Sequence, residues 1–351
     1  MKKTSLLLLL GAAMAFLASC SSPTSSSTSS TSSTSSTTYS NSVLPSKLSV
    51  AAPSSLTPAS GSPAASSAPA RAGTSPTGST QSAGFTEITT MTLMMKSMLP
   101  LAVTFGVVVD AVISQNSLTP GNDYKNQNVT LTQAMLNAIN AQVPPGQGIP
   151  ASDVGQTQAL TDVNYLATGT GTLQNQVAIT TTMGSTSQTI TYKWSTDRTK
   201  VLMTMTMSGT TLEISYDSTD GSGAFKVTDS SSDTFTMSMV PDPKSTTDGV
   251  SITSSITVAS AGTYAVYGYA DNNGGIVYTT VTPTSGSAAY WEEGFDSTGT
   301  LVFQNTFSGG FSGTETDAYN TSATNETSSK TTYGTNASSA SGLSTGASLL
   351  L

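Results

Sequence analysis

Residues 200–217 read KVLMTMTMSGTTLEISYD. Apolar side chains occupy alternate positions on both sides of the pair Ser208-Gly209. Alternation with a period of two is typical of a β-strand with one buried face, and a short glycine-containing connection between two such runs is typical of a hairpin. The stretch therefore predicts two antiparallel strands, and the following side chains share the alternating pattern: Val201, Met203, Met205, Met207, Leu212, Ile214 and Tyr216.

The same alternation continues on both sides of this hairpin, from Leu173 to Phe307. Turn signals such as Asp220-Gly221, Asn273-Gly274 and Thr298-Gly299 separate the apolar runs. Short strands at regular spacing, joined by turns, predict an antiparallel meander. We expect about eleven strands in a sheet that is curled or barrel-like, because curling or closure protects its edges.

A strongly apolar segment, Ile88–Gln115, precedes the predicted strands. It is long enough to span a bilayer, but Lys96 and Asp110 leave too short an uncharged stretch between them. We therefore expect a buried helix or pair of helices, kinked at Pro100. A membrane-associated hairpin is the alternative.

A second helix is expected after Thr130, which can form a capping-box pair with Gln133. It should end before Pro144, and residues 144–164 are expected to form a loop. The predicted fold class is therefore α+β and β-dominated, with one or two N-terminal helices ahead of the antiparallel meander. Residues 86–312 are expected to form one helix-plus-antiparallel-sheet domain.

Low-complexity sequence flanks this predicted domain. More than half of residues 21–85 are Ser or Thr, and residues 313–351 return to Ser, Thr, Gly and Asn. Such compositions bury too little apolar surface to offset the loss of chain entropy. We expect disordered termini, with a Ser/Thr-rich tether over 20–85 and a low-complexity tail over 313–351.

The N-terminus has the parts of an export signal. Lys2 and Lys3 are positively charged, and Leu6–Phe16 is apolar but too short for a stable membrane span. Leu17-Ala18-Ser19-Cys20 follows directly and matches a lipobox, so the segment resembles that of bacterial lipoprotein precursors.

This resemblance implies removal of the signal peptide 1–19 and a diacylglyceryl thioether on Cys20. In many bacteria the new amino group is acylated as well. Two or three acyl chains hold a protein durably at a membrane. Because Ser21 follows the cysteine where an Asp would indicate inner-membrane retention, the resemblance implies the outer membrane or cell surface of the bacterial envelope.

The chain is acidic, with 12 basic and 20 acidic side chains and a net charge of −8 at pH 7. Loss of Lys2 and Lys3 with the signal makes the mature chain more acidic still. An acidic surface repels nucleic acid and anionic lipid head groups. We therefore expect attachment to the membrane through the lipid anchor and no nucleic-acid partner.

The residue inventory excludes several classes of site. The chain has no histidine, and its single cysteine, Cys20, belongs to the lipobox. Histidine-dependent nucleophile sites, HExxH zinc sites and thiol chemistry are thereby excluded. We predict no enzyme activity and no catalytic, cofactor-binding or metal-binding residue, and Cys20 is the predicted site of lipidation.

Carboxylates are the acid–base groups that remain. Glu292 and Glu293 are neighbours on a predicted strand, so their side chains should point to opposite faces and cannot share one substrate. Most aspartates lie at predicted turns, where a short carboxylate caps the turn backbone. A calcium site is the alternative, but Asp217–Gly221 lacks the downstream Glu of a helix–loop–helix calcium loop.

Two groups of side chains are consistent either with a buried core or with a ligand-binding surface. Methionine fills cores and also adapts to varied apolar ligands. Aromatic rings stack on sugars and are also ordinary strand residues. The methionines are at 203, 205, 207, 237 and 239, and the aromatic residues are Tyr264, Tyr267, Tyr269, Tyr278, Tyr290 and Trp291.

Helices followed by antiparallel strands in a lipobox protein are similar in outline to the LolA/LolB-like lipoprotein carriers, which curl a sheet around an apolar cavity. We expect a membrane-anchored envelope or surface lipoprotein that acts as a non-catalytic binding domain. Its ligand would be an apolar molecule, a glycan or another envelope protein. A structural surface-display protein without a small ligand is one alternative, and a carboxylate-dependent glycan-active enzyme is the other.

Overall fold

The structure is a computed structural model that describes residues 53, 56, 81–141, 149–167, 170–183, 186–241 and 249–337. The predicted signal peptide 1–19, Cys20 and most of the predicted tether 20–85 lie outside these residues, and so do residues 338–351.

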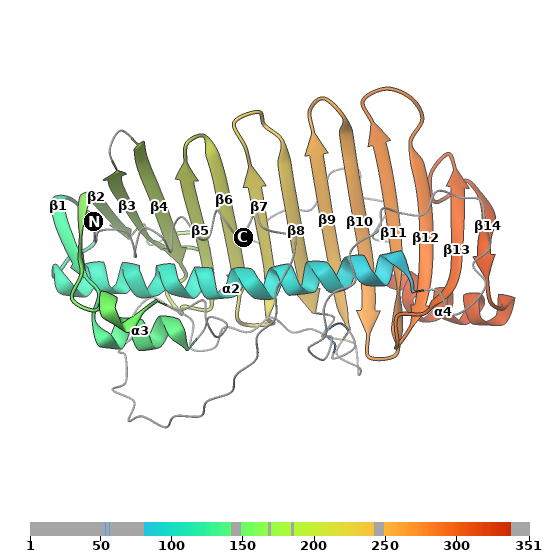
Figure 1. The fold of residues 1–351 in the computed structure, drawn as a ribbon, viewed down its shortest axis with the longest axis horizontal. Helices are drawn as coiled ribbons and strands as arrows, with labels where there is room; N and C mark the ends of the chain where they lie inside the picture. The colour runs from blue at the N-terminus through green and yellow to red at the C-terminus, as the bar shows by residue number, and fades with distance from the viewer. Residues whose placement is uncertain are drawn as a thin grey trace. The chain divides into compact units, whose positions relative to one another are not determined.

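Strands make up most of the described chain (Figure 1). The helices are α2 (Ala83–Gln115), α3 (Gln133–Asn140), the 3-10 helix η2 (Ala151–Asp153) and α4 (Ala323–Ala337). The strands are β1 (Asn122–Thr130), β2 (Thr157–Ala167), β3 (Asn175–Met183), β4 (Thr186–Trp194), β5 (Lys200–Met207), β6 (Thr210–Asp217), β7 (Ser222–Thr228), β8 (Thr234–Pro241), β9 (Val250–Val258), β10 (Gly262–Asp271), β11 (Gly274–Pro283), β12 (Ala289–Asp296), β13 (Leu301–Ser308) and β14 (Thr314–Asn320).

The strands are hydrogen-bonded in chain order, from β1 to β14, in a 14-stranded sheet. This confirms the predicted class, a β-dominated α+β fold built on an antiparallel meander. The eleven strands expected between Leu173 and Phe307 are β3–β13, and β1, β2 and β14 are additional. Among the described residues β1 pairs with β2 alone and β14 with β13 alone, so the sheet is not closed into a barrel.

The two end strands are polar, which is why apolar alternation did not predict them. β1 reads NDYKNQNVT and β14 reads TETDAYN, and most of their side chains are exposed. In β1, Asn126 has a φ of 53° and no partner in the register with β2, while Lys125 pairs with Asp123 at 2.9 Å and Asp162 at 2.7 Å. A charged and locally irregular edge discourages pairing with another chain.

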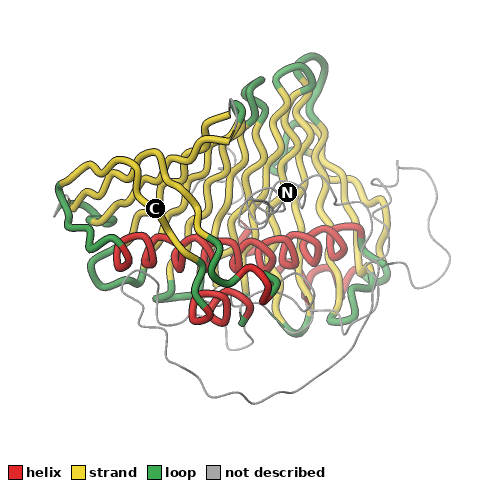
Figure 2. Tube along the Cα trace, turned by 60° about the vertical axis from the view of Figure 1, so that its left-hand side comes forward, coloured by secondary structure: helices red, strands yellow, loops and turns green. Residues whose placement is uncertain are grey.

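The apolar segment predicted as a helix or helix pair is one helix, α2, of 33 residues (Figure 2). By length and composition it is the one described helix that could cross a membrane, but most of its apolar stretch is buried within the protein. A core helix passes the same test of length and composition. The burial therefore agrees with the prediction of a buried helix.

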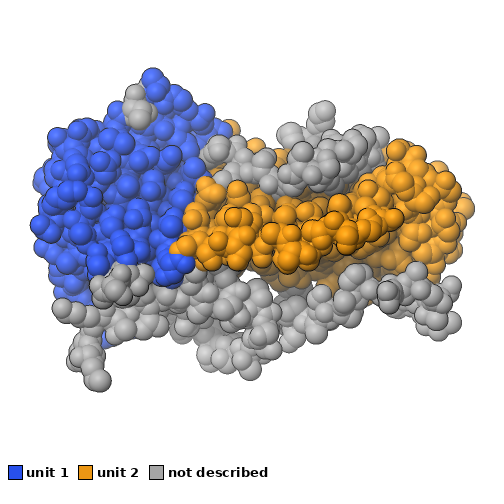
Figure 3. Space-filling view, turned by 90° about the horizontal axis from the view of Figure 1, so that it is seen from above, with its two compact units in different colours: residues 1–48, 98–208 blue, residues 49–97, 209–351 orange. Residues whose placement is uncertain are grey.

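The chain divides into two compact units (Figure 3). Of the described residues, 98–208 form the first, and residues 53, 56, 81–97 and 209–337 form the second. The single domain predicted over 86–312 thus falls into two such units, and α2 contributes its C-terminal half to the first and its N-terminal half to the second.

In the first unit, side-chain hydrogen bonds join the end of α2 to β1. The Gln115 amide donates to the carbonyl of Thr130 and accepts from its N–H, both at 2.8 Å. The next helix, α3, begins after Thr132, whose hydroxyl accepts from the N–H of Met135 at 3.2 Å. The predicted cap at Thr130 is therefore wrong by two residues, because Thr130 belongs to β1. β2 likewise occupies part of the predicted loop 144–164.

In the second unit the sheet is packed on both faces. On one face, a Cβ at Gly268 of β10 would lie 2.7 Å from Cγ2 of Ile88, so the backbone of the strand comes close to α2. The other face is set by the pleat, because neighbouring residues of a strand point in opposite directions. There Tyr333 of α4 packs in a buried cluster with Tyr269, Ile276 and Phe303.

β14 and α4 occupy residues 314–337, where the sequence predicts a tail without regular structure. The tail prediction is corrected for these residues, and its remainder lies outside the described chain. α4 reads ATNETSSKTTYGTNA, which is rich in Thr, Ser and Asn, and these residues form helices poorly on their own. Contacts with the sheet, rather than local propensity, account for this helix.

Candidate functional site

Two polar clusters lie on opposite faces of the strand pair β12–β13. Glu293 contacts the start of α2, whereas Glu292 contacts Lys330 of α4. Both carboxylates are almost fully buried. The predicted separation of these two neighbours is therefore confirmed, and each has its own set of partners.

The first cluster caps the N-terminus of α2. Glu293 accepts hydrogen bonds from the hydroxyl of Ser82 at 2.7 Å, the N–H of Gly84 at 2.9 Å and the side-chain amide of Gln304 at 2.8 Å. The Ser82 hydroxyl also accepts from the N–H of Phe85 at 3.0 Å. Backbone N–H groups at a helix start lack partners within the helix, and a carboxylate suits the positive end of the helix dipole.

A second carboxyl, Glu87, lies one turn along α2. The hydroxyl of Tyr264 donates to its two oxygens at 2.8 and 3.0 Å. Burial raises the pKa of Glu87 to about 7, and the charge of Glu293 adds to this rise, while the hydrogen bond from Tyr264 opposes it. Glu87 can therefore gain or lose a proton near neutral pH, which no pattern in the sequence indicated.

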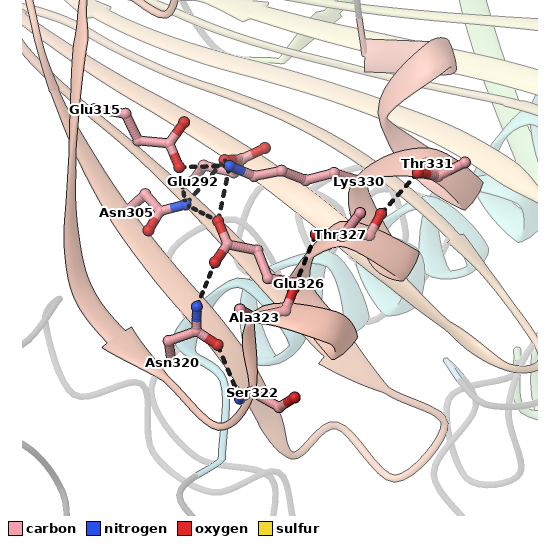
Figure 4. Close-up of polar contacts among 10 residues, drawn as sticks. All are labelled: Glu292, Asn305, Glu315, Asn320, Ser322, Ala323, Glu326, Thr327, Lys330 and Thr331. Carbon is pink, nitrogen blue, oxygen red and sulfur yellow. Dashed lines mark hydrogen bonds and ion pairs between the residues drawn. The ribbon is translucent and has the colours of Figure 1, made fainter.

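The second cluster surrounds the ammonium of Lys330 (Figure 4). Lys330 Nζ lies 2.5 Å from Glu315 Oε1, 2.8 Å from Glu326 Oε1 and 3.3 Å from Glu292 Oε2. Burial lowers the pKa of this lysine, but the hydrogen bonds to Glu315 and Glu326 and the charge of Glu292 outweigh burial and raise the pKa above its ordinary value. We call the five residues Glu292, Asn305, Glu315, Glu326 and Lys330 the Lys330 cluster.

Asn305 is the uncharged member of the Lys330 cluster and is fully buried. Its Nδ2 donates to Glu315 Oε1 at 2.7 Å, to Glu326 Oε1 at 2.8 Å and, more weakly, to Glu292 Oε2 at 3.5 Å. These are the same three oxygens that contact Lys330 Nζ. Within the described chain the buried Asn305 Oδ1 has no hydrogen-bond partner.

Aromatic rings and a capping contact lie beside the Lys330 cluster. The ring centroid of Phe303 lies 5.5 Å from Lys330 Nζ, and Tyr278 hydrogen-bonds Glu292. Asn320 donates to Glu326 and accepts from the N–H of Ser322 at 2.9 Å, at the start of α4. The cluster therefore joins α4 to β12, β13 and β14.

Three carboxylates at this edge lie close enough together to hold a cation. Oxygens of Glu315, Asp317 and Glu326 lie within 4.8 Å of one another, and carboxylate oxygens are ligands of hard cations. The ammonium of Lys330 already supplies a positive charge to two of them. The sequence prediction named no metal ligand here, because it treated these residues as tail.

The aromatic residues singled out in the sequence are divided between the two faces. Tyr264 lies on the α2 face with Glu87, and Tyr269 is buried against Tyr333. Tyr278 and Tyr290 belong instead to a group of rings packed edge-on around Phe311. The ring centroids of Tyr278, Tyr290 and Phe307 lie 5.2, 5.4 and 5.5 Å from that of Phe311, and all four rings are half-buried. We call these four residues the Phe311 group.

The other side chains considered in the sequence have structural roles. Aspartates at turns accept hydrogen bonds from the N–H two residues later: Asp217, Asp220, Asp229, Asp271 and Asp296. This confirms the capping interpretation for these five. Met203, Met205, Met237 and Met239 are buried, as expected of core residues.

Cys20, the predicted lipidation site, lies outside the described residues. No family model matches the chain, and no similar protein was found among curated sequences or solved structures.

Proposed function

We propose that this chain is a lipid-anchored, non-catalytic binding protein of a bacterial envelope. The lipobox Leu17–Cys20 supports the anchor, and the Ser/Thr-rich sequence that follows supports a spacer between membrane and folded units. The proposed location is the outer membrane or cell surface. A role without catalysis is supported by Glu292 and Glu293, which face opposite sides of the sheet and are both occupied by the chain's own donors.

The observation that carries the binding role is the Phe311 group. Large aromatic side chains usually bury most of their surface in a core, yet these four rings stay half-buried while packed against one another. Pre-packed rings offer rigid apolar surface to a ligand at a low entropic cost. A glycan of the envelope is the ligand class that we propose, because the apolar faces of sugars stack on such rings. The methionines do not offer an alternative apolar surface, since four of the five are buried.

The anchor is tested by detergent phase partitioning of the full-length protein expressed in a bacterium. We expect the wild type in the detergent phase and Cys20→Ala in the aqueous phase. Equal partitioning of both proteins into the aqueous phase would refute the anchor.

Binding is tested by co-sedimentation with purified peptidoglycan sacculi, the insoluble glycan of the envelope. The double variant Tyr290→Ala/Phe311→Ala should sediment at least tenfold less than the wild type, and Tyr124→Ala in β1 serves as the matched control. Circular dichroism of each variant verifies folding. Wild-type protein that remains in the supernatant would refute glycan binding and favour a structural display role.

A further inference from the structure

Lys330 Nζ and Asn305 Nδ2 contact the same three carboxylate oxygens. An amine and a carboxamide are therefore held side by side around shared acceptors, in a cluster whose amide is fully buried. We propose that Lys330 and Asn305 are joined by an intramolecular isopeptide bond in the mature protein.

Formation of the isopeptide bond between these side chains has three requirements. The amine must lie next to the carboxamide carbon, a base must take and return protons, and water must be kept from competing. Shared hydrogen bonds supply the proximity, which can replace a large part of the barrier of a bimolecular reaction. Glu292 supplies the base, because it is 3% exposed and contacts both nitrogens. Water is kept from the carboxamide because Asn305 is fully buried, whereas Lys330 is 29% exposed.

The reaction balances without any other reactant. The Lys330 ammonium passes one proton to Glu292, and the neutral Nζ attacks Cγ of Asn305. Glu292 gives this proton to Nδ2 and takes up a second proton from Nζ, and the Cγ–Nδ2 bond breaks to release ammonia. The ammonia takes that second proton from Glu292 and leaves as an ammonium ion. Ammonium and carboxamide thus become a secondary amide and an ammonium ion, so charge and atoms are conserved. Because the carboxylates stabilise the charged lysine, this proton transfer is the slow step, and one turnover during maturation is sufficient.

A covalent bond between Lys330 and Asn305 would stabilise the edge of the sheet formed by β14 and α4. α4 and β14 are made of residues with little intrinsic tendency to form a helix or a buried strand, yet they complete the edge of the sheet. The chain's single cysteine is Cys20, so a disulfide within the chain is not available. A bond from Lys330 to Asn305 fastens α4 directly to β13 and closes the loop that contains β14.

Mass spectrometry of the purified full-length protein tests the proposal directly. We expect an intact mass lower by one ammonia than the mass of the sequence, after allowance for removal of residues 1–19 and for lipidation. Trypsin adds a second readout, since Lys330 is the last basic residue of the chain. An acylated lysine is not cleaved, so residues 331–351 should remain attached to the peptide that contains Asn305. Full mass together with complete cleavage after Lys330 would overturn the proposal.

Two variants separate the isopeptide from other losses of ammonia. Lys330→Arg keeps a cation among the carboxylates but has no lysine amine, so its mass should equal that of its sequence. Cyclisation of Asn305 to a succinimide would also release ammonia, but it would persist in Lys330→Arg and would leave Lys330 of the wild type open to trypsin. That pattern would overturn the isopeptide. Glu292→Gln, which cannot accept the proton, should reduce the cross-linked fraction at least tenfold.

Discussion

Replacing Glu87 with glutamine tests whether a buried carboxyl opposes folding at neutral pH. Burial raises the pKa of Glu87 from 4.5 to about 7 in the folded protein, so the folded state keeps a proton that the unfolded chain has already released. Below pH 4.5 the group is protonated in both states and has no effect. As the pH rises from 4.5 to 7 the free energy of unfolding falls, and above 7 the loss stays constant at about 3 kcal/mol, since one pKa unit corresponds to about 1.4 kcal/mol.

Glu87→Gln should remove this loss without removing the contact with Tyr264. The glutamine oxygen can still accept from the tyrosine hydroxyl, which lies 2.8 Å from Glu87 Oε1. We therefore expect the variant to match the wild type near pH 4 and to exceed its free energy of unfolding by up to about 3 kcal/mol at pH 8. Urea denaturation at a series of pH values, followed by circular dichroism and by tryptophan fluorescence, measures the difference.

Tyr264→Phe is the companion variant. The hydroxyl of Tyr264 donates to Glu87 and lowers the pKa of that carboxyl. Loss of the hydroxyl should therefore move to higher pH the range over which the free energy of unfolding falls. The double variant with Glu87→Gln should show neither effect. If the difference between wild type and Glu87→Gln were the same at pH 4 and pH 8, Glu87 would not titrate in this range and the reasoning would fail.

Three further changes probe the packing. Gly268→Ala places a Cβ 2.7 Å from Ile88 Cγ2, so we expect α2 to be displaced, with a loss of about 1–3 kcal/mol seen as a lower melting temperature; an unchanged melting temperature would contradict the close approach. Thr132→Ala removes the cap of α3 and should cost about 1 kcal/mol, with faster hydrogen exchange in residues 133–140, whereas unchanged exchange would show that the cap is dispensable. Tyr333→Ala empties the buried contact of α4 with Tyr269 and should cost about 3 kcal/mol, and hydrogen exchange in residues 323–333 should rise; full protection there would show that other contacts hold the helix.

Apolar alternation predicted the middle of the sheet because each strand from β3 to β13 places some buried apolar residues on one face. It did not predict β1 and β14, because an edge strand gains its hydrogen bonds from one neighbour and need not bury its side chains. The helix α4 was missed for a related reason. Its Thr- and Ser-rich sequence has low helical propensity, and its position depends on Tyr333 and Lys330, whose partners are distant in sequence.

The polar clusters depend on contacts that spacing cannot reveal. Strand alternation placed Glu292 and Glu293 on opposite faces, but it could not show that Ser82 meets Glu293 across 211 positions. One local signal was present, since Glu326 and Lys330 have the i, i+4 spacing that stabilises helices. That spacing could have indicated α4, although not the carboxylates of β12 and β14 that complete the cluster.

The order of the strands has a consequence for how the chain acquires its structure. Each strand is hydrogen-bonded to the strands next to it in the chain. A polypeptide that emerges N-terminus first, from a ribosome or an export channel, can therefore add its strands to the sheet one at a time. The N-terminal half of α2 cannot be covered in this stepwise way. Its apolar surface emerges early in synthesis, whereas the strands that cover it are synthesised later. During that interval the nascent molecule is prone to stick to others, so a holding chaperone should matter most before β12 has emerged.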